Sequence, residues 1–116
     1  MQKFSRIYER FINLYLASCE MTDFPKLSAI ESRLLASLTA AWSKNEKVSV
    51  MNSTKLLTEI SGITCFRHLK SLKKKGYLQY VTDTSDSRIK LIEPTDLSKQ
   101  YTYRIGKIID EAAHQL

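Results

Sequence analysis

The chain has 116 residues, of which 43% are hydrophobic and 26% are charged; this allows one domain with a modest core and excludes a disordered chain. Two cysteines exclude a disulfide framework and, without a CxxC pair, a cysteine-based zinc site. No apolar run is long enough to cross a membrane, and charges within the first twenty residues argue against a targeting signal. We therefore expect a cytoplasmic protein with no membrane partner.

The net charge of +6 is concentrated in one part of the chain. Residues 62–90 contain seven basic side chains and two acidic ones, a local balance of +5. Concentrated positive charge favours a polyanionic partner, with nucleic acid ahead of an anionic membrane. A solvated helix face explains the charge alone equally well.

Residues 3–20 are predicted to form an amphipathic helix. Apolar residues recur there at spacings of three and four, and the stripe is rich in aromatic side chains: Phe4, Ile7, Tyr8, Phe11, Ile12, Leu14 and Tyr15. So aromatic a stripe in so short a chain is expected to bury partly against a partner subunit.

A second helix is predicted to begin at Ser28 and to end near Ser43. Ser28 and Glu31 have the spacing of a capping box, in which each side chain bonds an N–H group of the first turn. The apolar face that follows consists of Ile30, Leu34, Leu35, Leu38 and Trp42.

Residues 48–50 alternate β-branched and polar side chains and are predicted to form a short strand. Asn52 or Ser53 is expected to cap a short helix that Gly62 ends. A further helix is predicted from about Thr64 to Lys75, with Gly76 as its stop. The short helix is expected to carry Leu56, Leu57 and Ile60.

Residues 77–82 and 88–92 are predicted to form a hairpin around the turn sequence DTSDS. A helix-turn-helix followed by a hairpin is a winged helix. The last helix is expected to be capped by Thr95, and its stripe consists of Leu97, Tyr101, Ile105, Ile108, Ala112 and Leu116. The predicted fold class is therefore mainly α (α+β): one winged-helix domain over residues 1–116, with residues 1–20 and 95–116 as dimerisation helices.

The basic helix is predicted to present one face to DNA. With Leu69 at the centre of the inner face, Cys65, Phe66 and Leu72 pack inward. Two sets of residues are then expected to meet DNA: Thr64, Arg67, His68 and Ser71 near base edges, and Lys70, Lys74 and Lys75 at phosphates.

The hairpin carries Arg88 near its tip, followed by Lys90. An arginine at a hairpin tip fits a narrow A·T minor groove, and Asp86 can hold it extended through charge-assisted hydrogen bonds. The alternative is an exposed ion pair without a further role.

The stretch LKSLKKKGYLQYVTDTSDSRIKLIEPT resembles the segment of MarR-type transcriptional regulators that runs from the recognition helix through the wing. The resemblance implies that Asp86 and Arg88 are the wing pair, that the terminal helices form a homodimer and that the operator is pseudo-palindromic double-stranded DNA. It leaves two starts for the recognition helix, Ser61 or Thr64. A small-molecule effector is compatible with the family, but no residue of this chain points to one.

The leading interpretation is a sequence-specific DNA-binding regulator. The alternatives are a winged-helix protein-interaction module and a phage or plasmid replication initiator. We expect neither an enzyme nor a cofactor, because His68 and His114 lie on different helices and the sequence has no Gly-rich phosphate loop and no GxSxG turn. Cys19, near the end of the first helix, is a secondary candidate for an oxidation sensor.

Overall fold

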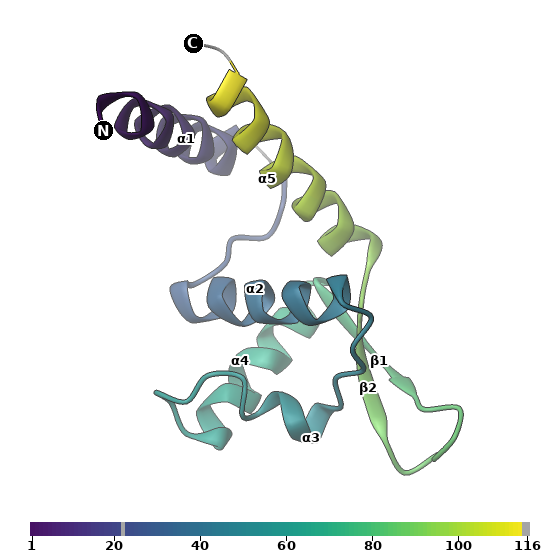
Figure 1. Cartoon of the computed structure of the whole chain (residues 1–116). Helices are drawn as coiled ribbons and strands as arrows, with labels where there is room; N and C mark the ends of the chain where they lie inside the picture. The colour runs from purple at the N-terminus through teal and green to yellow at the C-terminus, as the bar shows by residue number, and fades with distance from the viewer. Residues whose placement is uncertain (22, 115–116) are drawn as a thin grey trace. The chain divides into compact units, whose positions relative to one another are not determined.

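The computed structural model describes residues 1–21 and 23–114 (Figure 1). The elements follow the order α1 (Gln2–Met21), α2 (Ala29–Ser43), α3 (Val50–Ser53), α4 (Gly62–Lys74), β1 (Leu78–Thr82), β2 (Lys90–Pro94) and α5 (Asp96–His114). The mainly helical α+β class is confirmed. The chain divides into two compact units, which are unit 1 (residues 1–26 and 99–116) and unit 2 (residues 27–98). In the described part of the chain, no helix is long and apolar enough to span a membrane.

In unit 2, α2 begins at the predicted capping box. The Ser28 hydroxyl accepts a hydrogen bond from the N–H of Glu31 at 3.1 Å, and Glu31 Oε1 accepts one from the N–H of Ser28 at 2.8 Å. Leu34, Leu35 and Leu38 are buried and face α4 and the hairpin. The leucine face of α2 therefore forms the centre of the core of this unit.

The prediction of a strand at residues 48–50 is wrong. Ser49 makes only a single antiparallel bridge, to Leu91, and Val50 already begins α3. Val48 still contributes a backbone bond to the hairpin, because its carbonyl accepts the N–H of Ile92 at 2.8 Å. Alternation of Val, Ser and Val is too short a pattern to decide between a strand and the start of a helix.

The short helix begins earlier than predicted. Its N-cap is Ser49, whose hydroxyl accepts the N–H of Asn52 at 3.0 Å, so Asn52 and Ser53 lie inside the helix instead of capping it. The helix ends at Ser53. The residues predicted to lie on it therefore fall in the irregular segment that follows: Leu56, Leu57 and Ile60.

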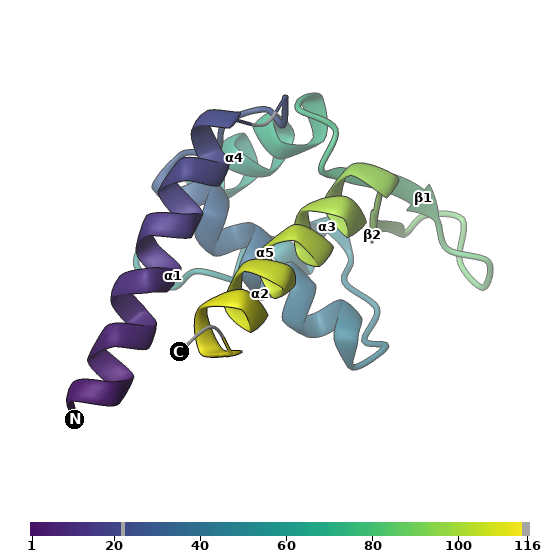
Figure 2. The same ribbon diagram turned by 90° about the horizontal axis from the view of Figure 1, so that it is seen from above.

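β1 and β2 form an antiparallel hairpin in which Leu78 is paired with Pro94 and Thr82 with Lys90. The second strand begins two residues later than predicted, so Arg88 belongs to the connecting loop. That loop extends beyond the strands, away from the helices of unit 2, in both views (Figures 1 and 2). The indole N–H of Trp42 donates to the carbonyl of Ile92 at 3.0 Å and ties the end of α2 to β2.

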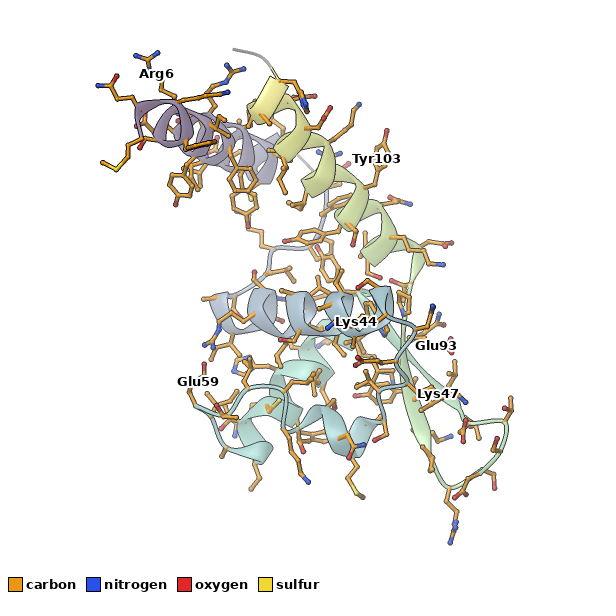
Figure 3. All side chains as sticks on the ribbon, viewed as in Figure 1. Arg6, Lys44, Lys47, Glu59, Glu93 and Tyr103 are labelled. Carbon is orange, nitrogen blue, oxygen red and sulfur yellow. The ribbon has the colours of Figure 1, made fainter. Side chains whose placement is uncertain are left out.

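In unit 1, α1 matches the predicted helix, yet none of its twenty residues is buried. Phe4 and Tyr8 are 71% and 63% exposed. On α5, Ile108 and Ala112 are buried, whereas Tyr103 points outward (Figure 3). The predicted stripe of α5 is therefore buried in part, and its last member, Leu116, lies outside the described residues.

α1 and α5 also meet through polar and aromatic groups. Arg104 donates to the Ser18 hydroxyl at 3.4 Å, and its guanidinium lies 4.9 Å from the centre of the Phe24 ring. Burial, together with the neighbouring Tyr101 and Cys19, raises the pKa of Tyr15 to about 12. Cys19 itself is exposed, and its role as an oxidation sensor stays a prediction.

Candidate nucleic-acid interface

α4 begins at the earlier of the two starts considered. Ser61 is the N-cap, and its hydroxyl accepts the N–H of Thr64 at 3.1 Å. Gly62, predicted to end the preceding helix, is instead the first residue of α4. At the other end, Gly76 has a φ of 91°, which glycine adopts without a side-chain clash, so α4 stops where predicted.

One row of side chains along α4 points away from the core of unit 2. At about 100° per residue, Ile63, Arg67, Lys70 and Lys74 fall within about 60° of one another. All four side chains are exposed. We call these four residues the outward row. It brings together three of the cations predicted to meet DNA and adds an isoleucine that the sequence analysis missed.

The inward face of α4 is rotated relative to the prediction. Cys65, Leu69 and Leu72 are fully buried, as predicted. Phe66 was also predicted to pack inward, and that prediction was wrong, because it is 39% exposed. Leu69 lies at one edge of the buried arc and not at its centre, so a face centred on it includes Phe66 incorrectly.

Three other predicted contacts lie at the margin of the outward row. Thr64, His68 and Ser71 are half-buried, and they share the flank of α4 opposite Phe66. The Thr64 hydroxyl accepts a hydrogen bond from the Ser61 hydroxyl at 2.9 Å. A hydrogen bond from the Ser71 side chain helps to lower the pKa of Glu31 of α2. The structure therefore does not bring these three together with the cations of the row.

Lys75, predicted to meet a phosphate, has an internal partner. Its ammonium lies 2.6 Å from Glu31 Oε1, and the Glu31 side chain is buried. Burial alone raises the pKa of Glu31, but the bonds from Lys75, Ser28 and Ser71 outweigh it and lower the pKa to about 2. Lys75 therefore ties the end of α4 to the start of α2.

The loop between β1 and β2, which we call the wing loop, exposes Arg88 to solvent next to Asp86. Its side chain is 88% exposed. Asp86 Oδ1 accepts hydrogen bonds from Arg88 Nε at 3.1 Å and from the Arg88 N–H at 3.0 Å, and Oδ2 accepts one from Nη2 at 3.1 Å. Hydrogen bonds from the Arg88 side chain and backbone hold the pKa of Asp86 below its usual value, so the aspartate remains charged. The predicted pairing of these two residues is present, and its contact with DNA stays a prediction.

The base of the wing carries further charge. Lys90 is exposed and donates to the hydroxyl of Thr82, its partner across the hairpin, at 2.9 Å. Asp83 forms an ion pair with Lys47 at 3.4 Å, and Lys47 lies on the segment beside the hairpin (Figure 3). The carboxylate of Asp83 is therefore compensated by a lysine from outside the hairpin.

An apolar groove separates the wing from the helix-turn-helix. It has a volume of about 520 Å³, and its lining includes Met51, Phe66, Ile89, Arg88 and Lys90. The ammonium of Lys70 lies 5.7 Å from the centre of the Phe66 ring, within range of a cation–π contact. Cations thus border an apolar surface on both sides of the groove.

Two side chains of types that can bind a metal or act as nucleophiles, Cys65 and His114, have partners within the chain. Among residues 1–21 and 23–114, no group of three His, Cys, Asp or Glu side chains is placed to hold a metal ion. Cys65 is buried, its thiol donates to the Ser53 carbonyl at 3.3 Å, and burial raises its pKa, which disfavours the reactive thiolate. His114 pairs with Asp110 on its own helix at 2.8 Å.

The sequence matches no protein-family model and no curated protein, whereas its structure resembles solved ones. The heme sensor protein PefR from Streptococcus agalactiae, in complex with heme, aligns at 20% identity over 95% of this chain and 74% of that one, with a TM-score of 0.61. BpsR from Bordetella bronchiseptica, whose DNA binding is regulated by 6-hydroxynicotinic acid, aligns at 20% identity over 97% and 79%, with a TM-score of 0.53. MarR from E. coli aligns at 17% identity over 97% and 76%, with the same score.

These proteins are MarR-family regulators. At such identities the likeness establishes a fold: this chain has the winged-helix fold of MarR-type regulators, as the resemblance in its sequence predicted.

Proposed function

We propose that this chain is a sequence-specific, DNA-binding transcription regulator that acts as a homodimer. α4 lies in the major groove, and Arg88 enters the adjacent minor groove. The observation that carries the proposal is the exposed arginine of the wing, whose side chain is hydrogen-bonded to Asp86, on the same unit as the outward row of α4.

The cations of the outward row are assigned two roles: some contact phosphates and provide affinity, and one contacts a base and provides sequence specificity. Lys70 and Lys74, in the middle and last turns of α4, are assigned to phosphates together with Lys90 of the wing. Arg67, in the second turn, is assigned to a base edge. Thr64, His68 and Ser71 lie at the margin of the row, and we assign them secondary contacts with the DNA. Lys75 has its partner in Glu31, so we assign it to the fold.

Dimerisation is assigned to α1 and α5. α1 buries none of its residues within the chain, although Phe4 and Tyr8 are large and apolar. Exposed aromatic side chains on a terminal helix are typical of a subunit interface. A two-fold dimer presents two copies of α4 and thus reads a pseudo-palindromic site. A solution mass near the 13.4 kDa of one chain at micromolar concentration would contradict this assignment.

The first experiment is selection of bound sequences from a random pool of duplexes with the full chain. The enriched duplex then serves in anisotropy titrations of Arg88→Ala and Arg67→Ala at several salt concentrations. We expect each variant to lose about tenfold or more in affinity, since one good arginine contact is worth about 1–3 kcal/mol. Arg33→Ala is the matched control, because Arg33 is an exposed arginine of unit 2 whose partner is Glu59, between α3 and α4 (Figure 3). Unchanged affinity and salt dependence in both test variants would contradict the docking mode.

The second candidate is a winged-helix module that binds another protein. The apolar groove lined by Met51, Phe66 and Ile89 favours it, because exposed apolar surface bordered by polar groups marks protein contacts. Absence of any binding to random duplex DNA at low salt would favour this candidate over the regulator.

A further inference from the structure

In unit 2 the exposed large apolar residues are not scattered. Among the described residues they are Met51, Ile63, Phe66 and Ile89. All four lie on α3, α4 or the loop between β1 and β2, and α4 and this loop carry the outward row and Arg88. Single exposed apolar residues are common, but this distribution places them all within the candidate interface.

Ile63 differs from the other three. Met51, Phe66 and Ile89 line the groove beside the wing. Ile63 is outside that lining, is 77% exposed and lies in the first turn of α4. On the helix it points in nearly the same direction as Arg67, one turn later. It is therefore an apolar group at the leading end of a row of cations.

An isoleucine at this position can recognise only one kind of base edge. The major-groove edges of guanine, adenine and cytosine present hydrogen-bond donors and acceptors, whereas thymine also presents a C5 methyl group. Packing Ile63 against a polar edge would remove water from groups that it cannot bond. Packing it against a methyl group buries apolar surface on both sides.

We propose that Ile63 selects thymine in the operator by packing against its C5 methyl group. This inference depends on the proposed function, because it requires α4 to lie in the major groove. It adds a residue that determines specificity and a base preference that the charged residues do not supply.

The test removes the methyl group from the DNA. Each thymine of the selected duplex is replaced in turn by uracil, which keeps the base pair and its hydrogen-bonding groups. We expect the affinity to fall about fourfold at one position in each half-site, as for the loss of one buried methyl or methylene contact. All other replacements should leave the affinity unchanged.

Protein variants then assign the effect to the residue. Ile63→Ala should bind the thymine and uracil duplexes equally, and Ile63→Val should keep part of the discrimination. The salt dependence of Ile63→Ala should equal that of the parent chain, because no phosphate contact is removed. Its far-UV circular dichroism spectrum should also be unchanged, since the side chain is exposed.

The outcomes separate this inference from the proposed function. If the selected duplex binds and no uracil replacement weakens binding, the thymine contact is refuted while the DNA-binding proposal stands. If Ile63→Ala still discriminates thymine from uracil, another residue makes the contact and the assignment is refuted. If no duplex is enriched from the random pool, both proposals fail together.

Discussion

In unit 2, α2 and α4 bury leucines completely, whereas α1 of unit 1, the longest helix described, buries no residue at all. Both units contain amphipathic helices with apolar side chains at spacings of three and four. The difference is what covers the apolar stripe. In unit 2 the chain supplies its own cover, while the stripe of α1 is left partly open within one chain. A periodic apolar pattern therefore predicts a helix reliably but does not say which molecule buries it.

The largest effect is expected in the core of unit 2. Leu69→Ala should lower the free energy of unfolding by about 4 kcal/mol, because Leu69 is fully buried and its truncation leaves a cavity. Urea denaturation measures this loss. Leu16→Ala makes the same chemical change at an exposed site of α1 and should cost less than about 1 kcal/mol. Equal losses in the two variants would remove the contrast between the units.

The next effect depends on pH. The pKa of Glu31 is about 2 in the folded chain, below its ordinary value of 4.5. The folded state therefore binds this proton less readily than the unfolded chain. The stabilisation is complete above about pH 4.5 and disappears as the pH falls toward 2, a loss of up to about 3 kcal/mol.

Glu31→Gln should remove this part of the acid dependence, as measured by urea denaturation at a series of pH values. Glu46→Gln, at an exposed position, is the control. If Glu31→Gln loses as much stability as the parent chain between pH 5 and pH 2.5, the ion pair of the buried Glu31 with the half-buried Lys75 is not the cause.

A smaller effect is expected in unit 1. The double variant Phe4→Ala with Tyr8→Ala should raise the dissociation constant of the dimer at least tenfold, because buried aromatic side chains dominate interface energies. Sedimentation equilibrium measures the constant. Asn13→Ala, on the opposite face of α1, should leave it unchanged. A dimer that is insensitive to the double variant would mean that another surface covers the stripe.

The smallest effect concerns the wing. Asp86→Asn should reduce the ratio of specific to random-DNA affinity about threefold, because Arg88 loses the charge that orients it. The free energy of unfolding should not change, since the pair is exposed at the tip of a loop. Both affinities can be measured by anisotropy. A constant ratio would show that Arg88 is oriented without its neighbour.

Features set by neighbouring residues were predicted well from the sequence. The capping box at Ser28, the stop at Gly76 and the cap at Thr95 each depend on residues within four positions, and all are present. The start of α3 was predicted wrongly because the neighbouring residues allow more than one cap. Ser49 and Asn52 are both good helix caps, and only the fold decides between them.

The candidate site was predicted less completely, because facing directions depend on tertiary contacts. Lys75 was expected at a phosphate, but it pairs with Glu31, which is 44 residues away in the sequence. Phe66 was missed as an exposed residue because an apolar side chain on a helix is usually assigned to the core, whereas Ile63 lay before the predicted helix start at Thr64. Their exposure could have been predicted from the sequence, because both side chains lie about 100° or more around the helix axis from Cys65 and Leu72.

The bond between Trp42 and Ile92 gives the molecule a built-in optical reporter. The chain contains a single tryptophan, and its indole donates directly to the second strand of the wing. The tryptophan fluorescence of the unlabelled protein, excited selectively over its six tyrosines, therefore originates where the hairpin is anchored. A titration with duplex DNA that displaces the hairpin should shift the emission maximum, and one that leaves the anchor intact should not.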